Sequence, residues 1–395
     1  MKNITIILLA VTASVLMTAC GGGGSSSSDT PINSSVINTK NIILFIGDGM
    51  GSEHRKSAQW ISVGITGRLA MDAVSSNGFI QTYSANGQVT DSAAAATAMA
   101  TGTKTDNGII GLDVNLNRLT SILENAKTLE KSTGLITTTQ MTHATPAAFA
   151  AHIEHRSLVL DIAEQMANKK IDVLLGGGEN DFLPILENGC FPKPGKRDDN
   201  RNLVNELTNS GYTYVCDNTS FQAITNNTTS KLIGLFADEG MTRPFSPSLA
   251  EMTQKAISLL SKNPKGFFLM IESGQIDWAS HENDASNAIS DTLSLDDAVK
   301  VAKEYASASN DTLIIITADH ETGGMTVSDV STGSADEDGP YNMPDGTKFY
   351  VNWDTTGHTG TNVPIGAYPA IFELFDGIHD NTYIYDLMSN EWLSN

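Results

Sequence analysis

Short apolar runs that alternate with helix-like stretches constrain the fold of this chain more than any other feature. The apolar runs are Asn41–Ile46, Phe79–Tyr83, Gly134–Thr139, Asp172–Leu175, Phe267–Ile271 and Leu313–Thr317. Several are continuously apolar, as expected for parallel strands buried on both faces. The helix-like stretches between them include Leu119–Leu129, Leu158–Asn168, Leu249–Leu260 and Leu295–Ala306. The alternation predicts a single large α/β domain with a mostly parallel central β-sheet flanked by helices on both faces.

The amino terminus carries an export signal rather than a part of the fold. A positive start is followed by a mostly apolar run and then by Leu16-Met17-Thr18-Ala19-Cys20. The pattern predicts a signal peptide over residues 1–19, and its ending resembles the lipidation motif of bacterial lipoproteins, in which Cys20 becomes the lipidated first residue. The apolar run is too short to predict a membrane-spanning helix. An ordinary cleaved signal followed by a chance cysteine is the alternative.

Residues 20–38 predict a flexible tether, because they include four consecutive glycines and four consecutive serines. The folded domain is expected at residues 39–395, with a surface excursion at about 187–227, where Asn, Pro, Gly and charged residues are frequent. Cys190 and Cys216 lie in that excursion and are a candidate disulfide, with two free thiols as the alternative. We expect a periplasmic, outer-membrane or cell-surface lipoprotein that touches the membrane only through a lipid on Cys20.

The net charge excludes one class of partner. With 45 acidic and 24 basic residues, the chain has a formal charge of −21. Such a surface repels nucleic acid and offers no basic stripe to bind it, so no specific nucleic-acid binding is expected.

Ser92 stands where the alanine-rich run Ala93–Gly102 should begin a helix, beside Asp91 and with no histidine next to it. The first turn of a helix offers free backbone N–H groups and the positive end of the helix dipole, which suit an anion such as phosphate. Ser92 is therefore a candidate nucleophile. The alternative is that Asp91 or Ser92 only caps the helix.

Acids and histidines follow the ends of three predicted strands. Asp48 lies in the glycine-rich turn after the first run, Glu272 follows the run that begins at Phe267, and Asp319-His320 follows the run that begins at Leu313. Ligands bind at the carboxyl ends of strands in open α/β sheets, and zinc takes such oxygen and nitrogen ligands readily. Each motif alone also fits an ordinary turn or a solvated loop.

Further ligand-type residues lie on helical or loop segments. Asp277 and His281 have the spacing i, i+4, which places both on one face of a helical turn. His143-Ala144-Thr145-Pro146 and the loop residue His358 add donors for a cation, and Arg156 adds a guanidinium that can grip phosphate at two points. A surface Asp/His pair, a helix cap, a loop histidine and a solvated arginine are the bland alternatives. The whole set predicts a multi-metal centre with a nucleophile and an anion clamp.

Taken in chain order, these motifs resemble bacterial alkaline phosphatase over about Asn41 to Phe372. They are Gly47-Asp48-Gly49-Met50-Gly51, Thr90-Asp91-Ser92-Ala93, His143-Ala144-Thr145-Pro146, Arg156, Glu272 with Asp277 and His281, Thr317-Ala318-Asp319-His320 and Gly357-His358-Thr359-Gly360. The resemblance implies a broad-specificity alkaline phosphatase that hydrolyses phosphate monoesters through a phosphoserine intermediate on Ser92. It also implies a homodimer.

The same resemblance implies two Zn²⁺ and one Mg²⁺ per subunit. The first zinc would be held by Asp277, His281 and His358. The second would be held by Asp48, Asp319, His320 and the oxygen of Ser92. Magnesium would be held by Asp48, Thr145 and Glu272, and Arg156 would bind phosphate together with Ser92.

The chain departs from the best-known enterobacterial pattern at two substrate-side positions. His143 stands where that form has an aspartate, and Trp278 stands where it has a lysine. The combination resembles cold-active and marine members of the family. Loss of a lysine removes one electrostatic contact with phosphate, so we expect faster phosphate release and a higher KM. His143 puts the preference for magnesium in doubt.

Two other functions fit parts of the sequence. One is a phosphodiesterase or sulfatase of the same metal-dependent superfamily, and the other is a phosphate-binding or adhesive lipoprotein without turnover. Ser92 together with Arg156 favours monoesters, because a diesterase has little use for an arginine on an additional phosphate oxygen. The intact nucleophile and ligand set favour an enzyme over a binding protein.

Overall fold

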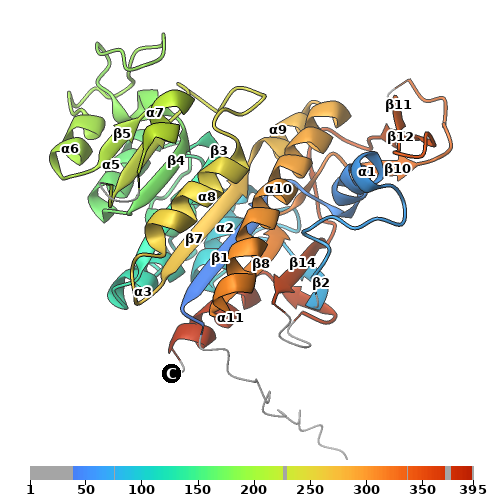
Figure 1. The fold of residues 1–395 in the computed structure, drawn as a ribbon, viewed down its shortest axis with the longest axis horizontal. Coiled ribbons are helices and arrows are strands. Elements are labelled where there is room, and N and C mark those ends of the chain that lie inside the picture. Colours follow the sequence, from blue (N-terminus) through green and yellow to red (C-terminus); the bar gives the residue numbers. More distant parts are fainter. Residues whose placement is uncertain (1–38, 75, 226–228, 336, 370–374, 394–395) are drawn as a thin grey trace, which may run out of the picture. The chain divides into compact units, whose positions relative to one another are not determined.

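A ten-stranded sheet forms the centre of the computed structural model, which describes residues 39–74, 76–225, 229–335, 337–369 and 375–393 (Figure 1). Val36–Asn395 forms one compact unit, whereas Met1–Ser35, with the predicted signal peptide and Cys20, lies outside the described residues. In spatial order the strands are β15 (Ile378–Asp380), β2 (Ser76–Gln81), β14 (Val363–Tyr368), β8 (Thr312–Ala318), β1 (Asn41–Gly47), β7 (Phe267–Ser273), β3 (Ser132–Gln140), β4 (Val173–Gly177), β6 (Leu232–Leu235) and β5 (Thr213–Val215).

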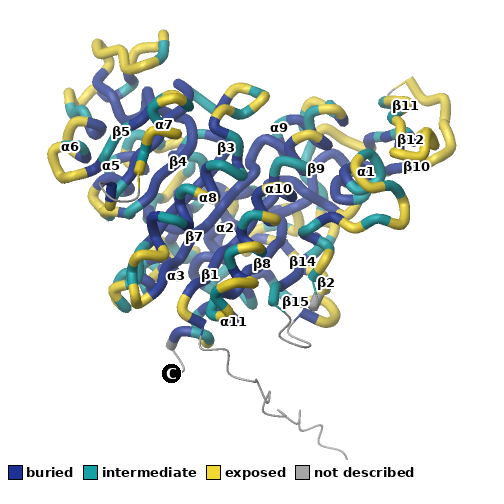
Figure 2. Tube along the Cα trace, in the orientation of Figure 1, coloured by how far each residue is buried: buried dark blue, intermediate teal, exposed yellow. Residues whose placement is uncertain are grey.

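The sheet is mostly parallel, as predicted. Every neighbouring pair from β8 to β5 is parallel, and β15 is parallel to β2. Only β14 runs antiparallel to its two neighbours, β8 and β2. All residues of β1, β7 and β8 are buried, which explains their continuous apolar sequences (Figure 2).

Helices cover both faces of this sheet. On one face α8 (Leu249–Leu260) packs against β3 and β7, and α10 (Ala285–Ser309) packs against β1, β7 and β8 (Figure 1). The other face is covered by α2 (Ser92–Thr101), α3 (Ile122–Thr128), α4 (Ala144–Ala150) and α11 (Tyr383–Leu393), which contact one another, while α3 and α4 also touch β3 and β7. The remaining helices are α1 (Ser52–Val63), α5 (Val159–Lys169), α6 (Leu203–Asn209), α7 (Asn218–Ala223) and α9 (Gln275–His281).

The predicted helices are present with shifted ends. The stretch Leu249–Leu260 coincides with α8, whereas α3 is shorter than Leu119–Leu129 and α5 is displaced by one residue from Leu158–Asn168. The stretch Leu295–Ala306 is only the second half of α10. Its first half is dominated by small and polar residues that carry little apolar periodicity, and the side chain of Asp284 caps its start.

The segment 187–227 carries regular structure of its own. It contains α6, β5 and α7, and β5 pairs with β6 to complete one edge of the sheet. Cys190 and Cys216 are joined by a disulfide with a Cα–Cα distance of 6.3 Å. None of the helices in the described part of the chain is long and apolar enough to cross a membrane.

Two small antiparallel sheets follow β8. One is formed by β10 (Thr326–Ser328), β12 (Lys348–Asn352) and β11 (Asp338–Asn342), and the other pairs β13 (His358–Thr359) with β9 (Glu321–Thr322). A second apolar cluster, with Phe349 and Trp353, packs the first of these sheets against Ala279 of α9 and Ile289 of α10. The backbone N–H of Thr322 in β9 donates to the carbonyl of Gly49, just after β1, which places β9 and its partner β13 beside the carboxyl edge of the large sheet.

Candidate metal centre

The parallel register brings the predicted acids together at one edge of the sheet. Gly47, the last residue of β1, pairs with Ser273 of β7 and with Ala318 of β8. Asp48 and Asp319 therefore follow their strands at the same level, and Glu272 lies near the end of the adjacent strand β7, as the register partner of Ile46. All three are fully or almost fully buried. Buried carboxylates so close together require compensation by positive charge.

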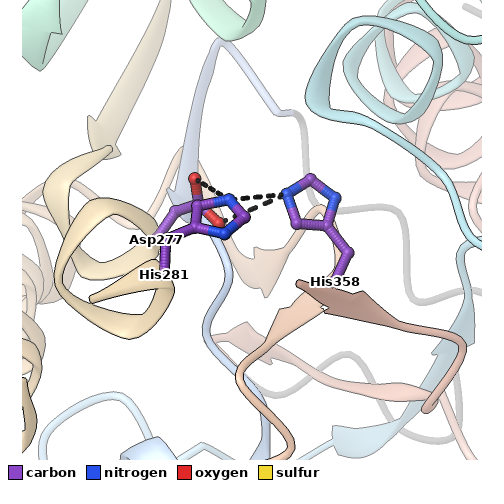
Figure 3. A group of neighbouring side chains, drawn as sticks. All are labelled: Asp277, His281 and His358. Carbon is purple, nitrogen blue, oxygen red and sulfur yellow. Dashed lines mark hydrogen bonds and ion pairs between the residues drawn. The ribbon is translucent and has the colours of Figure 1, made fainter. Parts of the chain in front are cut away.

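A first group consists of Asp277, His281 and His358, whose donor atoms all lie within 4.8 Å of one another (Figure 3). The Nε2 atoms of the two histidines are 3.1 Å apart, and they lie 3.3 and 3.5 Å from the two carboxylate oxygens of Asp277. Each Nδ1 faces a backbone carbonyl, at 2.6 Å for His281 and 2.8 Å for His358, and must donate to it. In the neutral form of each ring, the Nε2 lone pair is therefore available to a cation.

A second group surrounds Ser92. His320 Nε2 lies 3.4 Å from Asp48, 3.3 Å from Asp319 and 3.3 Å from Ser92 Oγ. The hydroxyl of Ser92 is also 3.4 Å from Asp48 Oδ2. The donor atoms of Asp48, His320 and Asp277 also lie within 4.8 Å of one another, so Asp277 lies between the first group and the second.

A third group consists of Asp48, His143 and Glu272. His143 Nδ1 lies 4.0 Å from each of the two carboxylates. Thr145 is buried on α4, and its hydroxyl meets no hydrogen-bond partner among the described residues. The acids and histidines of the three predicted sets thus lie in one continuous centre, in which His143 joins Asp48 and Glu272.

Several buried atoms of the centre that could bind a cation have no hydrogen-bond partner within the described ranges. They are Asp48 Oδ1, His143 Nδ1, Thr145 Oγ1, Glu272 Oε1 and Asp319 Oδ2. For Asp319 the other oxygen accepts from the backbone N–H of Gly49 and of His320, and for Glu272 the other oxygen accepts from Thr137. The protein therefore holds one oxygen of each carboxylate and leaves its second oxygen unpartnered, as a cation site requires.

The acids of the centre are out of their usual pKa range. Burial raises the pKa of Asp48 well above its ordinary value, and the charges of Asp319 and Asp277 add to this. Burial also raises the pKa of Glu272 to about 7 and that of Asp319 to about 6. Asp277 differs: burial opposes its charge, but hydrogen bonds from His281 and His358 outweigh burial and hold its pKa well below the usual range. Such shifts are typical of sites built to hold cations or protons.

The start of α2 places Ser92, the candidate nucleophile, beside Arg156, the candidate anion clamp. Asp91 is the cap, since its side chain accepts from the backbone N–H of Ala94 at 3.0 Å. Ser92 is not needed as a cap and turns its hydroxyl into the second group. Arg156 donates to Asp91 at 3.1 Å and reaches His143 Nε2 at 3.1 Å, so its guanidinium lies over the helix start. A helix N-terminus and a guanidinium side by side are the groups that bind oxyanions in proteins.

Trp278 lies beside His143 of the third group. It is partly buried on α9, and its ring meets His143 edge-on at 6.1 Å between centroids. A cavity of about 90 Å³ beside His143 and Arg156 is also lined by Asp181 and Lys196. Lys196 pairs with Asp181 at 2.9 Å, so it does not replace the missing lysine as a free charge.

The alkaline phosphatase family model matches residues 39–336 of the chain. The chain belongs to the alkaline phosphatase family. Alkaline phosphatase 4 of Bacillus subtilis (strain 168) is 41% identical over 305 residues, which cover 73% of this chain and 62% of that protein. The solved alkaline phosphatase of the Antarctic bacterium TAB5 is 33% identical, covers 90% of this chain with 99% of its own, and has a TM-score of 0.77. A TAB5 variant with a histidine changed to aspartate, with magnesium in its M3 site, has 33% identity, 89% and 97% coverage and a TM-score of 0.74.

Membership of the alkaline phosphatase family confirms the resemblance read from the ordered motifs, and the fold is the predicted one. The sequence reasoning missed the residues that hold the ligands in place. His54 is one of them: it is fully buried, accepts from the backbone N–H of Gly51 at 3.2 Å and contacts Ser280 of α9 at 2.9 Å. Thr137, which donates to Glu272, and Asp91, which accepts from Arg156, are others. Nothing in the sequence around these residues distinguishes them from ordinary threonines and aspartates.

Gly49 shows how tightly the turn after β1 is packed. Its φ is +74°, and a Cβ there would lie 2.8 Å from Thr322 Oγ1 and 3.0 Å from Asp277 Cα. We expect Gly49→Ala to destabilise the protein by about 2 kcal/mol more than Gly346→Ala. Gly346 is the matched control, because its φ is +86° but nothing lies near its Cβ position. Urea unfolding of both variants measures the difference, and equal losses would contradict the crowding argument.

Proposed function

We propose that this alkaline phosphatase family member hydrolyses phosphate monoesters, with Ser92 as the nucleophile. The observation that carries the proposal is the position of the Ser92 hydroxyl. It lies at a helix start, 3.3 Å from His320 and 3.4 Å from Asp48, with the guanidinium of Arg156 over the same helix start. Negative charge on a transferring phosphoryl group would meet the helix start and the guanidinium, while Asp48 and His320 would hold a cation beside it.

The donor sets fit cations of two kinds. Two zinc ions suit the nitrogen and oxygen donors of Asp277, His281 and His358, and of Asp48, Asp319 and His320 with Ser92. Asp48, Thr145 and Glu272 offer oxygens alone, which suits magnesium. The TAB5 variant that holds magnesium carries aspartate in place of a histidine. In this chain His143 adds a nitrogen donor beside Asp48 and Glu272. Magnesium at the third site is therefore proposed on the three oxygen donors alone. Bound there, such ions supply positive charge to the attacking and leaving oxygens of an in-line displacement.

The residues of the chain then have defined roles. Ser92 Oγ gives its proton to solvent and forms a bond to phosphorus as the bond from phosphorus to the ester oxygen breaks. The leaving oxygen takes a proton from solvent, which gives an alcohol and a phosphoserine. A water molecule cleaves the phosphoserine and regenerates the hydroxyl with release of inorganic phosphate. Arg156 holds the phosphoryl oxygens in both steps, and Asp91 fixes the guanidinium.

The first experiment is p-nitrophenyl phosphate hydrolysis at alkaline pH by the protein from Asp29 onward, with zinc and magnesium present. We expect turnover that a chelator abolishes and that added metal restores. No turnover by the metal-loaded protein on this ester, with turnover on a phosphodiester or a sulfate ester, would replace the proposal with the diesterase or sulfatase alternative. Binding of phosphate without turnover on any of them would indicate a binding protein.

Trp278 is proposed to weaken phosphate retention. We expect Trp278→Lys to lower both the inhibition constant of phosphate and KM by up to about tenfold, because one added charged contact is worth roughly 1.4 kcal/mol. Product release should slow and lower kcat. Trp278→Gln, which removes the ring without adding charge, is the control. Phosphate inhibition that is the same in both variants would remove the electrostatic explanation.

Anchoring and assembly are further proposals. Cys20 follows an export signal and precedes a glycine-serine tether, which supports a lipid anchor. Incorporation of a labelled fatty acid that is lost in Cys20→Ser would support it, and equal incorporation would exclude it.

The homodimer rests on the family resemblance, and sedimentation equilibrium tests it: a monomer at all concentrations would exclude it.

A further inference from the structure

Thr322 lies at the junction of the segments that carry the ligands. It belongs to the two-residue strand β9 and is completely buried. Its backbone N–H donates to the carbonyl of Gly49 at 3.1 Å, in the turn that follows β1 and Asp48. Across the small sheet, Thr322 is the register partner of His358. One residue thus touches the turn of Asp48 and the strand of His358 through its backbone alone.

The hydroxyl of Thr322 joins the first group to the second. Oγ1 donates to Asp277 Oδ1 at 2.5 Å and lies 3.2 Å from His320 Nδ1. A hydroxyl has one proton to donate, and the ionised carboxylate of Asp277 accepts that hydrogen bond. The second bond can then form only if His320 Nδ1 carries a proton and donates it to Oγ1. The Nε2 lone pair of His320 is consequently directed toward Asp48, Asp319 and Ser92.

His320 differs in this respect from the other two histidines. Backbone carbonyls of Thr356 and Thr90 fix the tautomers of His281 and His358. A side chain has this task at His320. Partners on the second ring nitrogen set both the ring orientation and the basicity of a ligating histidine, and their loss typically costs 10–100-fold in metal affinity or activity.

We propose that Thr322 is a positioning residue of this phosphatase centre, whose hydroxyl fixes the tautomer of His320 and the carboxylate of Asp277 so that both present their donor atoms to adjoining cation sites. The inference rests on the proposed function, since it needs cations at these groups. It assigns Thr322 no contact with the substrate. Removal of the hydroxyl leaves His320 Nδ1–H without a partner and frees the carboxylate of Asp277 to rotate.

The test compares variants of the full chain that share the shape of threonine or share its hydroxyl. Thr322→Val keeps the branched shape and removes the hydroxyl, whereas Thr322→Ser keeps the hydroxyl. Thr253→Val is the matched control, because Thr253 is also fully buried and its hydroxyl donates to a backbone carbonyl at 2.8 Å in α8, away from the centre. Zinc-loaded protein is mixed with a chromogenic chelator, and the rate of zinc release is measured beside kcat and KM.

We expect T322V to release zinc about 10–100-fold faster than wild type and to lose kcat by a similar factor. T322S should recover most of the zinc retention and most of kcat, and T253V should match wild type in both. The unfolding midpoint of metal-free T322V should stay close to that of metal-free wild type. Zinc release from T322V at the wild-type rate would overturn the proposal, as would a loss that T322S does not recover. If valine prevents folding, Thr322→Ala gives the same comparison with T322S. Wild-type protein that neither retains zinc nor hydrolyses phosphate esters would instead contradict the proposed function.

Discussion

Replacement of Ser92 by alanine is expected to reduce phosphate ester turnover by about 10⁴-fold or more, the scale on which serine hydrolases lose activity when the nucleophile is removed. The variant keeps α2, because Asp91 caps the helix and alanine is the best helix former. Arg156 keeps its bond to Asp91, so phosphate should still bind. The loss should therefore appear in kcat rather than in the unfolding midpoint.

The covalent step has its own readout. Wild-type protein quenched with acid during turnover should yield a phosphorylated peptide that contains Ser92, and the variant should yield none. Thr101→Ala is the control, since Thr101 lies buried at the other end of the same helix, where its hydroxyl donates to the carbonyl of Thr97 and accepts from the backbone N–H of Thr103. A variant that retains a tenth of the wild-type kcat, or a phosphopeptide at another residue, would assign the nucleophile elsewhere.

The central strands could be predicted because burial on both faces leaves a strong signal. β1 and β8 are largely continuous apolar runs of strand length, too short for a helix of ordinary length, and β1 ends in a glycine-rich turn. β14 gave no such signal, because it contains Pro364 and Gly366, which are rare inside strands. Its antiparallel place between β8 and β2 depends on contacts made across the sheet. The four residues of β6, with a glycine among them, are equally weak as a pattern.

The ligands could be predicted for a related reason. A parallel sheet brings the ends of its strands to one edge, so Asp48, Glu272 and Asp319 were expected to meet once their strands were recognised. The residues that hold them were not recognised, because each acts across a long sequence separation. Thr322 and Asp277 are 45 positions apart, and Thr137 and Glu272 are 135 apart. Threonine is common in strands and loops, so only the folded structure distinguishes these from the others.

Removal of the divalent cations is the second large effect that we expect, and it reaches stability as well as turnover. The buried oxygens of Asp48, Glu272 and Asp319 that have no hydrogen-bond partner would then lack the cations that offset their charge. Burial has already raised the pKa of Glu272 to about 7, so its ionised form is disfavoured in the folded protein without metal. Cations favour the ionised form, which couples their binding to folding. The metal-loaded protein should unfold at least a few degrees above the metal-free protein at pH 8.

The sign of the pH dependence follows from the direction of each shift. A carboxyl whose pKa is raised by folding loses stability as the pH rises toward the folded value, and Glu272 does so up to about pH 7. A hydrogen bond to Asp277 raises the pKa of His281 to about 9, so its contribution is present at low pH and is lost between about pH 6.5 and 9. Below pH 6.5 the buried neutral histidines act in the opposite direction, because burial lowers the pKa of His54, His143 and His320. Metal-free protein should therefore lose stability between pH 6.5 and 9.

Thermal unfolding of metal-free and metal-loaded protein at pH 6.5, 7.5 and 9 measures this loss. The gap between the two midpoints should widen with pH over that range, while metal-loaded protein stays nearly constant. Glu272→Gln removes the charge that burial disfavours, so the metal-free variant should unfold above metal-free wild type at pH 9 and should lose less stability on the way there. Glu282→Gln, at an exposed position after α9, is the control and should follow wild type. A metal-free protein whose midpoint rises from pH 6.5 to 9 would show that the acids of the centre are compensated by the protein itself, and the requirement for cations would lose its physical basis.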